Sequence, residues 1–203
     1  MKKYISLFLA AVILLSFTAC GRKNKENANP TTTPTNVQME LPDSALALLQ
    51  TVWTSYGEND QFPAMGGSYN EDESKNNHVD NGPGKYDLAD DGLMSKLMVP
   101  EAEKGKIAEA ASLTHGMMLN NFTCGAYKMA AGADAKVFGQ AMYKSITEQR
   151  FLCGSPEAIL VVTLGNDYVV AAFGLNELMG TLKNKIVAAY PGAQVLYNQL
   201  IPA

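Results

Sequence analysis

The sequence is poor in several features that would mark a special class of protein. Its 203 residues contain only 3 Cys, 2 His and 1 Trp, and 16 Lys plus Arg stand against 20 Asp plus Glu, a formal net charge of −4 at pH 7. An acidic chain lacks the basic surface that binds phosphate backbones, so nucleic acid is disfavoured as a partner. A hydrophobic content of 47% is ordinary for a globular protein and excludes a collagen, a disordered tail and a multi-pass membrane protein.

Motifs for cofactor binding and for familiar catalysis are also missing. Gly66-Gly67 belongs neither to a P-loop nor to a Gly-x-Gly-x-x-Gly fingerprint, and no Gly-x-Ser-x-Gly elbow occurs. Arg150 is the only arginine after residue 42, which leaves little for bidentate recognition of phosphate. We therefore expect no cofactor and assign no catalytic residue.

The N-terminus carries an export signal. Lys2 and Lys3 precede an apolar run over residues 5–17, which is too short to span a bilayer, and residues 17–20 are Phe-Thr-Ala-Cys. This ending resembles the bacterial lipobox, in which the cysteine thiol receives a diacylglycerol and the cysteine becomes the mature N-terminus. It predicts lipidation of Cys20 and anchoring at the extracytoplasmic face of the bacterial cell membrane. Because most lipoboxes carry Leu where this chain has Phe, a simple secretory signal is the alternative.

Three segments are predicted. Residues 1–19 form the lipoprotein signal peptide, residues 20–42 a disordered, lipid-anchored tether, and residues 43–203 a single α+β globular domain. The tether is rich in Asn, Thr, Pro and Lys and cannot bury enough apolar surface to become ordered. Removal of Lys2 and Lys3 with the signal takes the net charge from −4 to −6.

The first half of the domain is predicted to hold helices around a long polar loop. Asp43 or Ser44 caps a helix that runs to residue 56, and residues 57–91 form a polar stretch too long for a plain connector. A short helix is expected over residues 93–98. Another is expected over residues 100–118, because its apolar residues recur at helical spacing.

The second half is predicted to have the order β-α-β-β-α-β. Strands are expected over residues 122–129, 158–164, 168–173 and 194–201, with helices over 134–150 and 176–190. This is the order of the ferredoxin-like fold, which places both helices on one face of a four-stranded antiparallel sheet. The two hairpin strands are apolar on both sides, so the second face needs a cover. The N-terminal helices and the long polar loop supply it in one interpretation, and a homodimer that pairs its sheets in the other.

Two cysteines, Cys124 and Cys153, fall at the same end of this predicted sheet. A disulfide between them would close a loop of about 30 residues and stabilise the domain by roughly 3 kcal/mol. Two separate buried thiols are the alternative. Together with His78 and His115 they could supply four zinc ligands, but no pair has the short spacing of structural zinc sites, so no metal site is assigned.

The polar loop over residues 57–91 is the predicted binding loop. It is acidic, yet residues 62–69 and 82–86 are more apolar and glycine-rich than a spacer requires. If the protein has a ligand cleft, we expect its lining to include Met65, Gly66, Gly67, Tyr69, Tyr86 and Asp87. The alternative is that these segments pack as an ordered cover over the sheet. No calcium site is assigned, because residues 87–98 place Ala and Met where an EF-hand loop needs oxygen ligands.

Several short motifs carry a resemblance to a known family. They are the lipobox, the polar tether, Ala-Met-Gly-Gly at 64–67, Asn-Phe-Thr-Cys-Gly at 121–125, Phe-Leu-Cys-Gly at 151–154, and the glycine-bounded hairpin segment at 165–174. Together they are similar to a family of small lipoproteins from Gram-positive gut anaerobes that carries no assigned activity, a domain of unknown function. The resemblance implies the same localisation and transfers no catalytic residue.

The leading functional hypothesis is a non-catalytic binding or interaction module at the cell envelope. Besides the bilayer, held through Cys20, its partner would be an envelope protein or a small ligand, and the domain would be a monomer or a homodimer. The alternative is a cell-surface hydrolase that uses carboxylates of the 57–91 loop, such as Asp87 with Asp91. A structural module of a larger envelope complex is the third interpretation.

Overall fold

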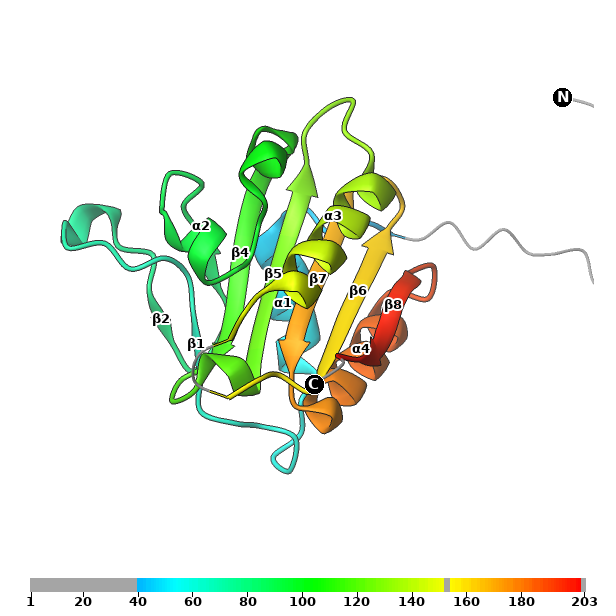
Figure 1. Cartoon of the computed structure of the whole chain (residues 1–203). Helices are drawn as coiled ribbons and strands as arrows, with labels where there is room; N and C mark the ends of the chain where they lie inside the picture. Colours follow the sequence, from blue (N-terminus) through cyan, green and yellow to red (C-terminus); the bar gives the residue numbers. More distant parts are fainter. Residues whose placement is uncertain (1–39, 152–153, 202–203) are drawn as a thin grey trace, which may run out of the picture. The chain divides into compact units, whose positions relative to one another are not determined.

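The computed structural model describes residues 40–151 and 154–201, which form an antiparallel sheet with helices on both faces (Figure 1). The helices are α1 Ala45–Thr54, α2 Gly92–Ser95, α3 Ala135–Glu148 and α4 Asn176–Ala189, with 3-10 turns at Glu73–Lys75, Glu101–Lys106 and Leu119–Asn121. The strands are β1 Ala64–Gly66, β2 Val79–Asp80, β3 Gly84–Tyr86, β4 Ile107–His115, β5 Phe122–Met129, β6 Ala158–Leu164, β7 Tyr168–Gly174 and β8 Gln194–Leu200. The α+β class is confirmed. In the part of the chain that the structure describes, no helix has the length and apolarity to cross a membrane.

The strand order differs from the predicted ferredoxin-like sheet. Seven of the eight strands follow the order β2-β1-β4-β5-β7-β6-β8, and the eighth, β3, pairs with β4 on the same edge as β1. The predicted element order holds from β5 to β8, and β7 lies between β5 and β6 as expected. However, β8 pairs with β6, because β4 already occupies the other edge of β5. The sheet therefore has eight strands where four were expected.

This change of edge explains why α3 and α4 lie on opposite faces. The α3 crossover joins β5 to β6 over β7, and the α4 crossover joins β7 to β8 over β6. Both connections step in the same direction along the sheet, but they start from strands that run in opposite directions. Since such crossovers are almost always right-handed, the two helices must cover opposite faces. Figure 1 shows α3 in front of the sheet and α1 and α4 behind it.

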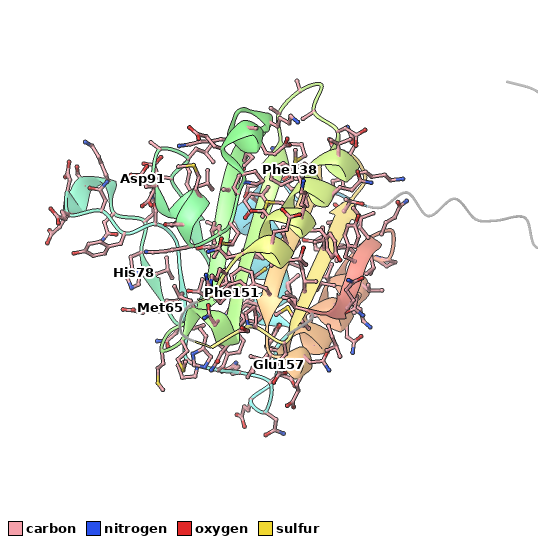
Figure 2. The ribbon with its side chains drawn as sticks, in the orientation of Figure 1. Met65, His78, Asp91, Phe138, Phe151 and Glu157 are labelled. Atoms are coloured by element: carbon pink, nitrogen blue, oxygen red, sulfur yellow. The ribbon has the colours of Figure 1, made fainter. Side chains whose placement is uncertain are left out.

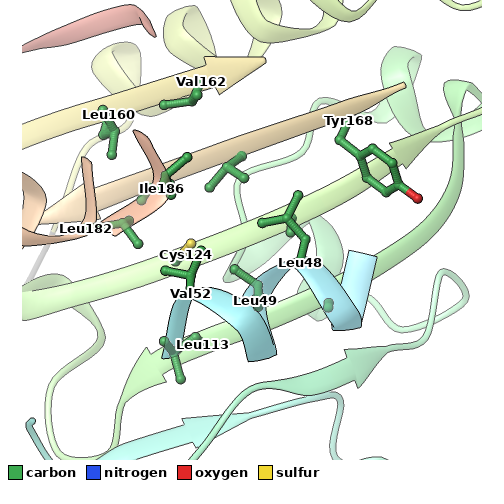
Figure 3. Close-up of a cluster of buried hydrophobic side chains, with 14 of the residues drawn as sticks. Leu48, Leu49, Val52, Leu113, Cys124, Leu160, Val162, Tyr168, Leu182 and Ile186 are labelled. Atoms are coloured by element: carbon green, nitrogen blue, oxygen red, sulfur yellow. The ribbon is translucent and has the colours of Figure 1, made fainter. Parts of the chain in front are cut away.

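Two apolar cores result, one on each face. Behind the sheet, α1 and α4 pack on side chains of β4 to β7, and Leu48, Leu49, Leu160, Val162 and Ile186 are buried there (Figure 3). In front, α3 and α2 cover a second cluster that includes Tyr127 and Phe138. Both hairpin strands, β6 and β7, are buried along their whole length. The second face that the sequence left without a cover is thus covered by helices of the same chain.

The strand β4 replaces the helix that was predicted over residues 100–118. Only residues 101–106 are helical, as a 3-10 turn, and residues 107–115 pair with β5 on one side and with β1 and β3 on the other. Ala110 belongs to the front core and Ala111 to the rear core, so small side chains face both ways. A strand buried on both faces shows no alternation of apolar and polar residues. Its alanines therefore gave a helical pattern by coincidence.

The polar loop becomes a short-stranded extension of the sheet rather than a cover over its face. Within residues 57–91, β1 and β3 pair with β4, and β2 pairs with β1. Phe62, at the start of this region, packs on Phe122 and Trp53 of the rear core. The loop is thus an ordered edge of the domain.

The chain joins the domain through contacts to its backbone just before α1. The hydroxyl of Tyr168 donates to the carbonyl of Pro42 at 2.6 Å, and Lys128 Nζ donates to the carbonyl of Asp43 at 2.9 Å. Ser44 then caps α1 by accepting from Ala47 N at 3.0 Å, as one of the two predicted caps. These contacts fix the start of the domain to one end of β5 and β7.

Candidate functional site

A pocket of about 230 Å³ lies where α2 faces β1, β3 and β4. It is lined by Met65, Gly66, Gly67, Tyr69, His78, Tyr86, Lys96, Leu97, Ser112, Thr114 and Leu119. We call it the glycine-walled pocket. Five of the six predicted binding-loop residues line it; the sixth, Asp87, lies outside. Figure 2 shows Met65 and His78 close together at the β1–β2 edge, with Asp91 further away at α2.

One wall is bare backbone, because two glycine pairs bring chain segments into contact. A Cβ at Gly84 would stand 2.6 Å from Gly67 N, and one at Gly66 would collide with the backbone of Gly82 and Gly84. Gly67 also has a φ of +80°, a conformation that side chains other than Gly rarely adopt, and a Cβ there would meet the carbonyl of Asn77. Glycine is therefore required at these positions, and the wall carries no side chain there.

The base of the pocket contains two hydroxyl groups of β4 that tie β1 in place. Gly67 N donates to Ser112 Oγ at 2.9 Å, and Thr114 Oγ1 donates to the carbonyl of Met65 at 3.2 Å. Ser112 is buried. Because both hydroxyls already bond to the backbone of the wall, they support its shape rather than act as free reactive groups.

The charged groups that line the pocket are His78 and Lys96. His78 Nε2 lies 3.1 Å from Asp80 Oδ1, so its imidazole has a carboxylate partner. Lys96 is exposed at the end of α2, and none of the ion pairs among the described residues includes it. No acidic residue is among those that line the pocket.

Large apolar side chains are exposed around the mouth. Tyr69 is 63% exposed, and Met117, which precedes the lining residue Leu119 by two positions, is 78% exposed. Met118 and Val79 are also exposed. A Cβ at Gly116 would stand 3.4 Å from Met65 Cγ, so this Met-rich turn lies near the pocket-lining Met65. Exposed apolar side chains grouped at a concave site are typical of a binding surface, and Met adapts well to varied partners.

Asp87 takes a structural role in a neighbouring turn. Its backbone N–H donates to Ser68 Oγ at 3.1 Å, and its carboxylate accepts from Ala89 N at 2.9 Å. It lines a second, more open cavity of about 430 Å³ together with Lys85 and Glu109. Asp87 is therefore separated from the other predicted binding residues, although Tyr86 lines both cavities.

The carboxylates proposed for the hydrolase alternative are occupied with turns or exposed. Asp91 is exposed at the start of α2. The carboxylate of the preceding residue, Asp90, accepts a hydrogen bond from Gly92 N at 2.6 Å. In the same region, hydrogen bonds with Lys185 and with Ser74 lower the pKa of Asp60 and of Asp72, respectively. A catalytic acid of a hydrolase needs a pKa shifted in the opposite direction.

The remaining sequence candidates lie apart from the pocket. Cys124 is a free thiol in the rear core, and burial raises its pKa; Cys153 and Cys20 are outside the described residues. His115 Nδ1 accepts from the backbone N–H of Met117, and its ring stacks on Phe62. Among the described residues, no three His, Cys, Asp or Glu side chains are grouped as metal ligands would be.

Six lining residues were not predicted, and four of them come from elements assigned differently. Lys96 and Leu97 fall in the short helix expected over residues 93–98, which ends at Ser95 in the structure, while Ser112 and Thr114 lie on β4, which was expected to be helical. The spacing of two hydroxyl residues at i and i+2 was the available signal, because it places both on one side of a strand.

Comparison with known proteins identifies no relative of this chain. No protein-family model, no curated protein and no solved structure matches this chain. The lipoprotein resemblance therefore stays a prediction from the sequence, and function must be argued from the site.

Proposed function

We propose that this protein is an exported, lipid-anchored binding module of the cell envelope that holds a small ligand, or an apolar group of a partner, in the glycine-walled pocket without catalysing a reaction. The observation that carries the proposal is the pocket itself. Its glycine wall is fixed by backbone contacts and by Ser112 and Thr114, so the cavity exists before any ligand arrives.

The chemistry of the lining supports binding over catalysis. The hydroxyl of Ser112 accepts from Gly67 N and is buried. His78 is engaged with Asp80 at the mouth. A nucleophile needs a base within hydrogen-bond reach, and no hydrogen bond among the described residues joins Ser112 to His78.

Envelope localisation rests on the sequence. The lipobox-like ending at Cys20, the polar tether over residues 20–42 and the resemblance to envelope lipoproteins all support it. The test is metabolic labelling with a fatty-acid analogue in a bacterial host. We expect label on the wild-type chain and none on Cys20→Ala, while Cys124→Ala keeps the label. Equal labelling of the wild-type and Cys20→Ala chains would overturn the anchor.

Binding at the pocket is tested with a fragment screen on the full chain in detergent micelles, read by methyl NMR of Met and Leu side chains. Fragments should shift the methyl signals of Met65 and Leu97. The substitution Leu119→Trp should block the mouth and abolish these shifts. Leu175→Trp, at a similarly exposed leucine before α4, is the matched control and should leave them unchanged.

The screen can also refute the proposal. Fragments that shift only signals remote from the pocket, or shifts that survive Leu119→Trp, would show that this cavity is not the binding site.

A further inference from the structure

The sign of the charge at the pocket is opposite to that of the protein. The whole chain has a formal net charge of −4, and the 57–91 loop that supplies most of one wall is acidic. Nevertheless, no Asp or Glu is among the residues that line the pocket, whereas Lys96 is. No carboxylate therefore lines the glycine-walled pocket, although the protein as a whole is acidic.

Lys96 differs from several other lysines of the domain in having no carboxylate partner. Lys75, Lys106, Lys128 and Lys185 all form ion pairs with Asp or Glu at 2.8 to 3.5 Å. No ion pair among residues 40–151 and 154–201 includes Lys96. A Cβ at Gly92, the first residue of α2, would stand 3.4 Å from Lys96 Cδ and 2.7 Å from Asp90 Oδ1, so the aliphatic stem of Lys96 runs back along α2 on the side of Asp90. An unpaired cation beside an apolar cavity attracts an anion more strongly than it would in open water.

The other ionisable group of the lining is less free. The imidazole of His78 is held by Asp80, whose side chain is 80% exposed and is not part of the lining. Asp80, on β2, is therefore an acidic group next to a lining residue, and it is already paired with His78. Lys96 remains the charge that is left for a ligand.

The size and the walls define the rest of the ligand. A volume of about 230 Å³ is below the range of about 300–1,000 Å³ usual for drug-sized ligands, so a body of roughly one ring fits. Met65, Leu97 and the ring of Tyr86 give apolar contact, and the glycine wall adds no side chain that would narrow the cavity.

We infer that the glycine-walled pocket selects a small anionic ligand: a carboxylate on a ring-sized apolar body, with the acid group paired to Lys96 and the body between Met65 and Leu97. The inference rests on the proposed function, because it names the class of ligand for the same site.

The test compares three probes of one shape on the full chain in detergent micelles at pH 7: benzoate, neutral benzamide and cationic benzylamine. Affinities are read from the shifts of the Met65 and Leu97 methyl signals. Benzoate should bind about tenfold more tightly than benzamide, as expected for a charge-assisted hydrogen bond at a partly exposed site. In Lys96→Gln this preference should disappear through loss of benzoate affinity, with benzamide affinity unchanged.

Two variants separate charge at the pocket from charge in general. Lys96→Glu should reverse the order, so that benzylamine binds more tightly than benzoate. Lys144→Gln, which removes an exposed lysine of α3 that does not line the pocket, should leave the benzoate preference intact. Both substitutions are at exposed positions, so folding is not expected to change.

The probes distinguish failure of the inference from failure of the proposed function. Equal binding of benzoate and benzamide at the pocket, or a benzoate preference that survives in Lys96→Gln, would overturn the inference and leave the pocket as a binding site. If none of the probes shifts the Met65 or Leu97 signals, the proposed function fails and the inference fails with it.

Discussion

Two regions of the same sheet are held together by different means. The strands β5, β6 and β7 are buried on both faces, and large side chains of α3 and α4 fill the space above and below them. At the β1–β3 edge, backbone lies directly on backbone, and Gly66, Gly67 and Gly84 leave no room for a Cβ. The first region is stabilised by packing between large side chains. The second requires glycines, because any side chain there would push the two backbone segments apart. The pocket belongs to the second region, where rigid backbone leaves a cavity that flexible side chains would fill.

The largest loss of stability is expected from removing a large side chain from the front core. Phe138 is fully buried and meets the Tyr127 ring edge-on at 5.3 Å, so Phe138→Ala should lower the free energy of unfolding by about 3–5 kcal/mol. Urea denaturation measures the change. Its neighbour Val137 is about half exposed, and Val137→Ala should stay within about 0.5 kcal/mol. A loss below about 1 kcal/mol for Phe138→Ala would contradict the packing described for the front core.

The second effect tests the backbone-packed edge directly. Gly67→Ala introduces a Cβ at a positive φ and against the carbonyl of Asn77, and should cost about 1–3 kcal/mol. Gly132 has a φ of +82° with no atom near its Cβ position, so Gly132→Ala isolates the backbone strain and should cost about 1 kcal/mol.

The two glycine variants also differ at the pocket. Gly67→Ala should abolish the fragment-induced shifts at Met65, because the wall moves, whereas Gly132→Ala and Phe138→Ala should preserve them in the folded protein. Unchanged fragment binding in Gly67→Ala would show that the glycine wall does not shape the site.

A smaller loss of stability is expected from removing the single hydrogen bond that caps α1, the first helix of the side-chain-packed region. Ser44 Oγ accepts from Ala47 N at the start of α1, and Ser44→Ala should lower the free energy of unfolding by about 1 kcal/mol. Ser44→Asp keeps the acceptor and should restore most of the loss. If the alanine and aspartate variants unfold at the same urea concentration, the cap does not stabilise α1.

The smallest change in stability is expected from an ion pair that connects the two regions, and this change depends on pH. Asp60 Oδ2 lies 2.8 Å from Lys185 Nζ of α4, and the hydrogen bond with Lys185 lowers the pKa of Asp60. A carboxyl whose pKa is lower in the folded state adds stability above its unfolded-state pKa and loses that contribution as the pH falls through its folded-state pKa. Asp60→Asn should therefore reduce the urea midpoint slightly at pH 7 and flatten its fall towards pH 3. A parallel pH profile for the two proteins would contradict this role, and Glu58→Gln, at an exposed acid of the same loop, serves as the control.

Prediction from sequence worked where side-chain periodicity decides the structure. The strand β5, the β6–β7 hairpin and the helices α1, α3 and α4 were all located, and residue boundaries agree closely. In these elements the apolar residues repeat with a period of two or 3.6, or form uninterrupted apolar runs between turn residues.

Prediction failed where tertiary pairing decides the structure. Ala110 and Ala111 face opposite cores, and alanine is a good helix former, so β4 looked helical. Because β4 was missed, the free edge of β5 was assigned to the last strand, and α4 was placed on the wrong face of the sheet. A single misassigned strand thus changed the whole topology.

The candidate site was half predictable for the same reason. The glycines at 66 and 67 indicated a special backbone, and the structure groups them with Met65, Tyr69 and Tyr86. The cation Lys96 and the two hydroxyls of β4 reach the pocket only through the three-dimensional arrangement of α2 and β4. Hydrogen bonds such as that from Gly67 N to Ser112 Oγ, 45 residues apart, leave no periodic trace in the sequence.

The contacts of Tyr168 and Lys128 to the backbone before α1 have a mechanical consequence. They hold the chain at the end of the sheet where β4 begins, opposite Glu109, and the pocket residue Thr114 lies five residues further along β4, about 17 Å away. If Cys20 is held in a bilayer, any pull on the tether is transmitted first to the Pro42 and Asp43 carbonyls. The load would then pass into β5 and β7, the central strands, and from β5 into β4, which pairs with the pocket strands β1 and β3.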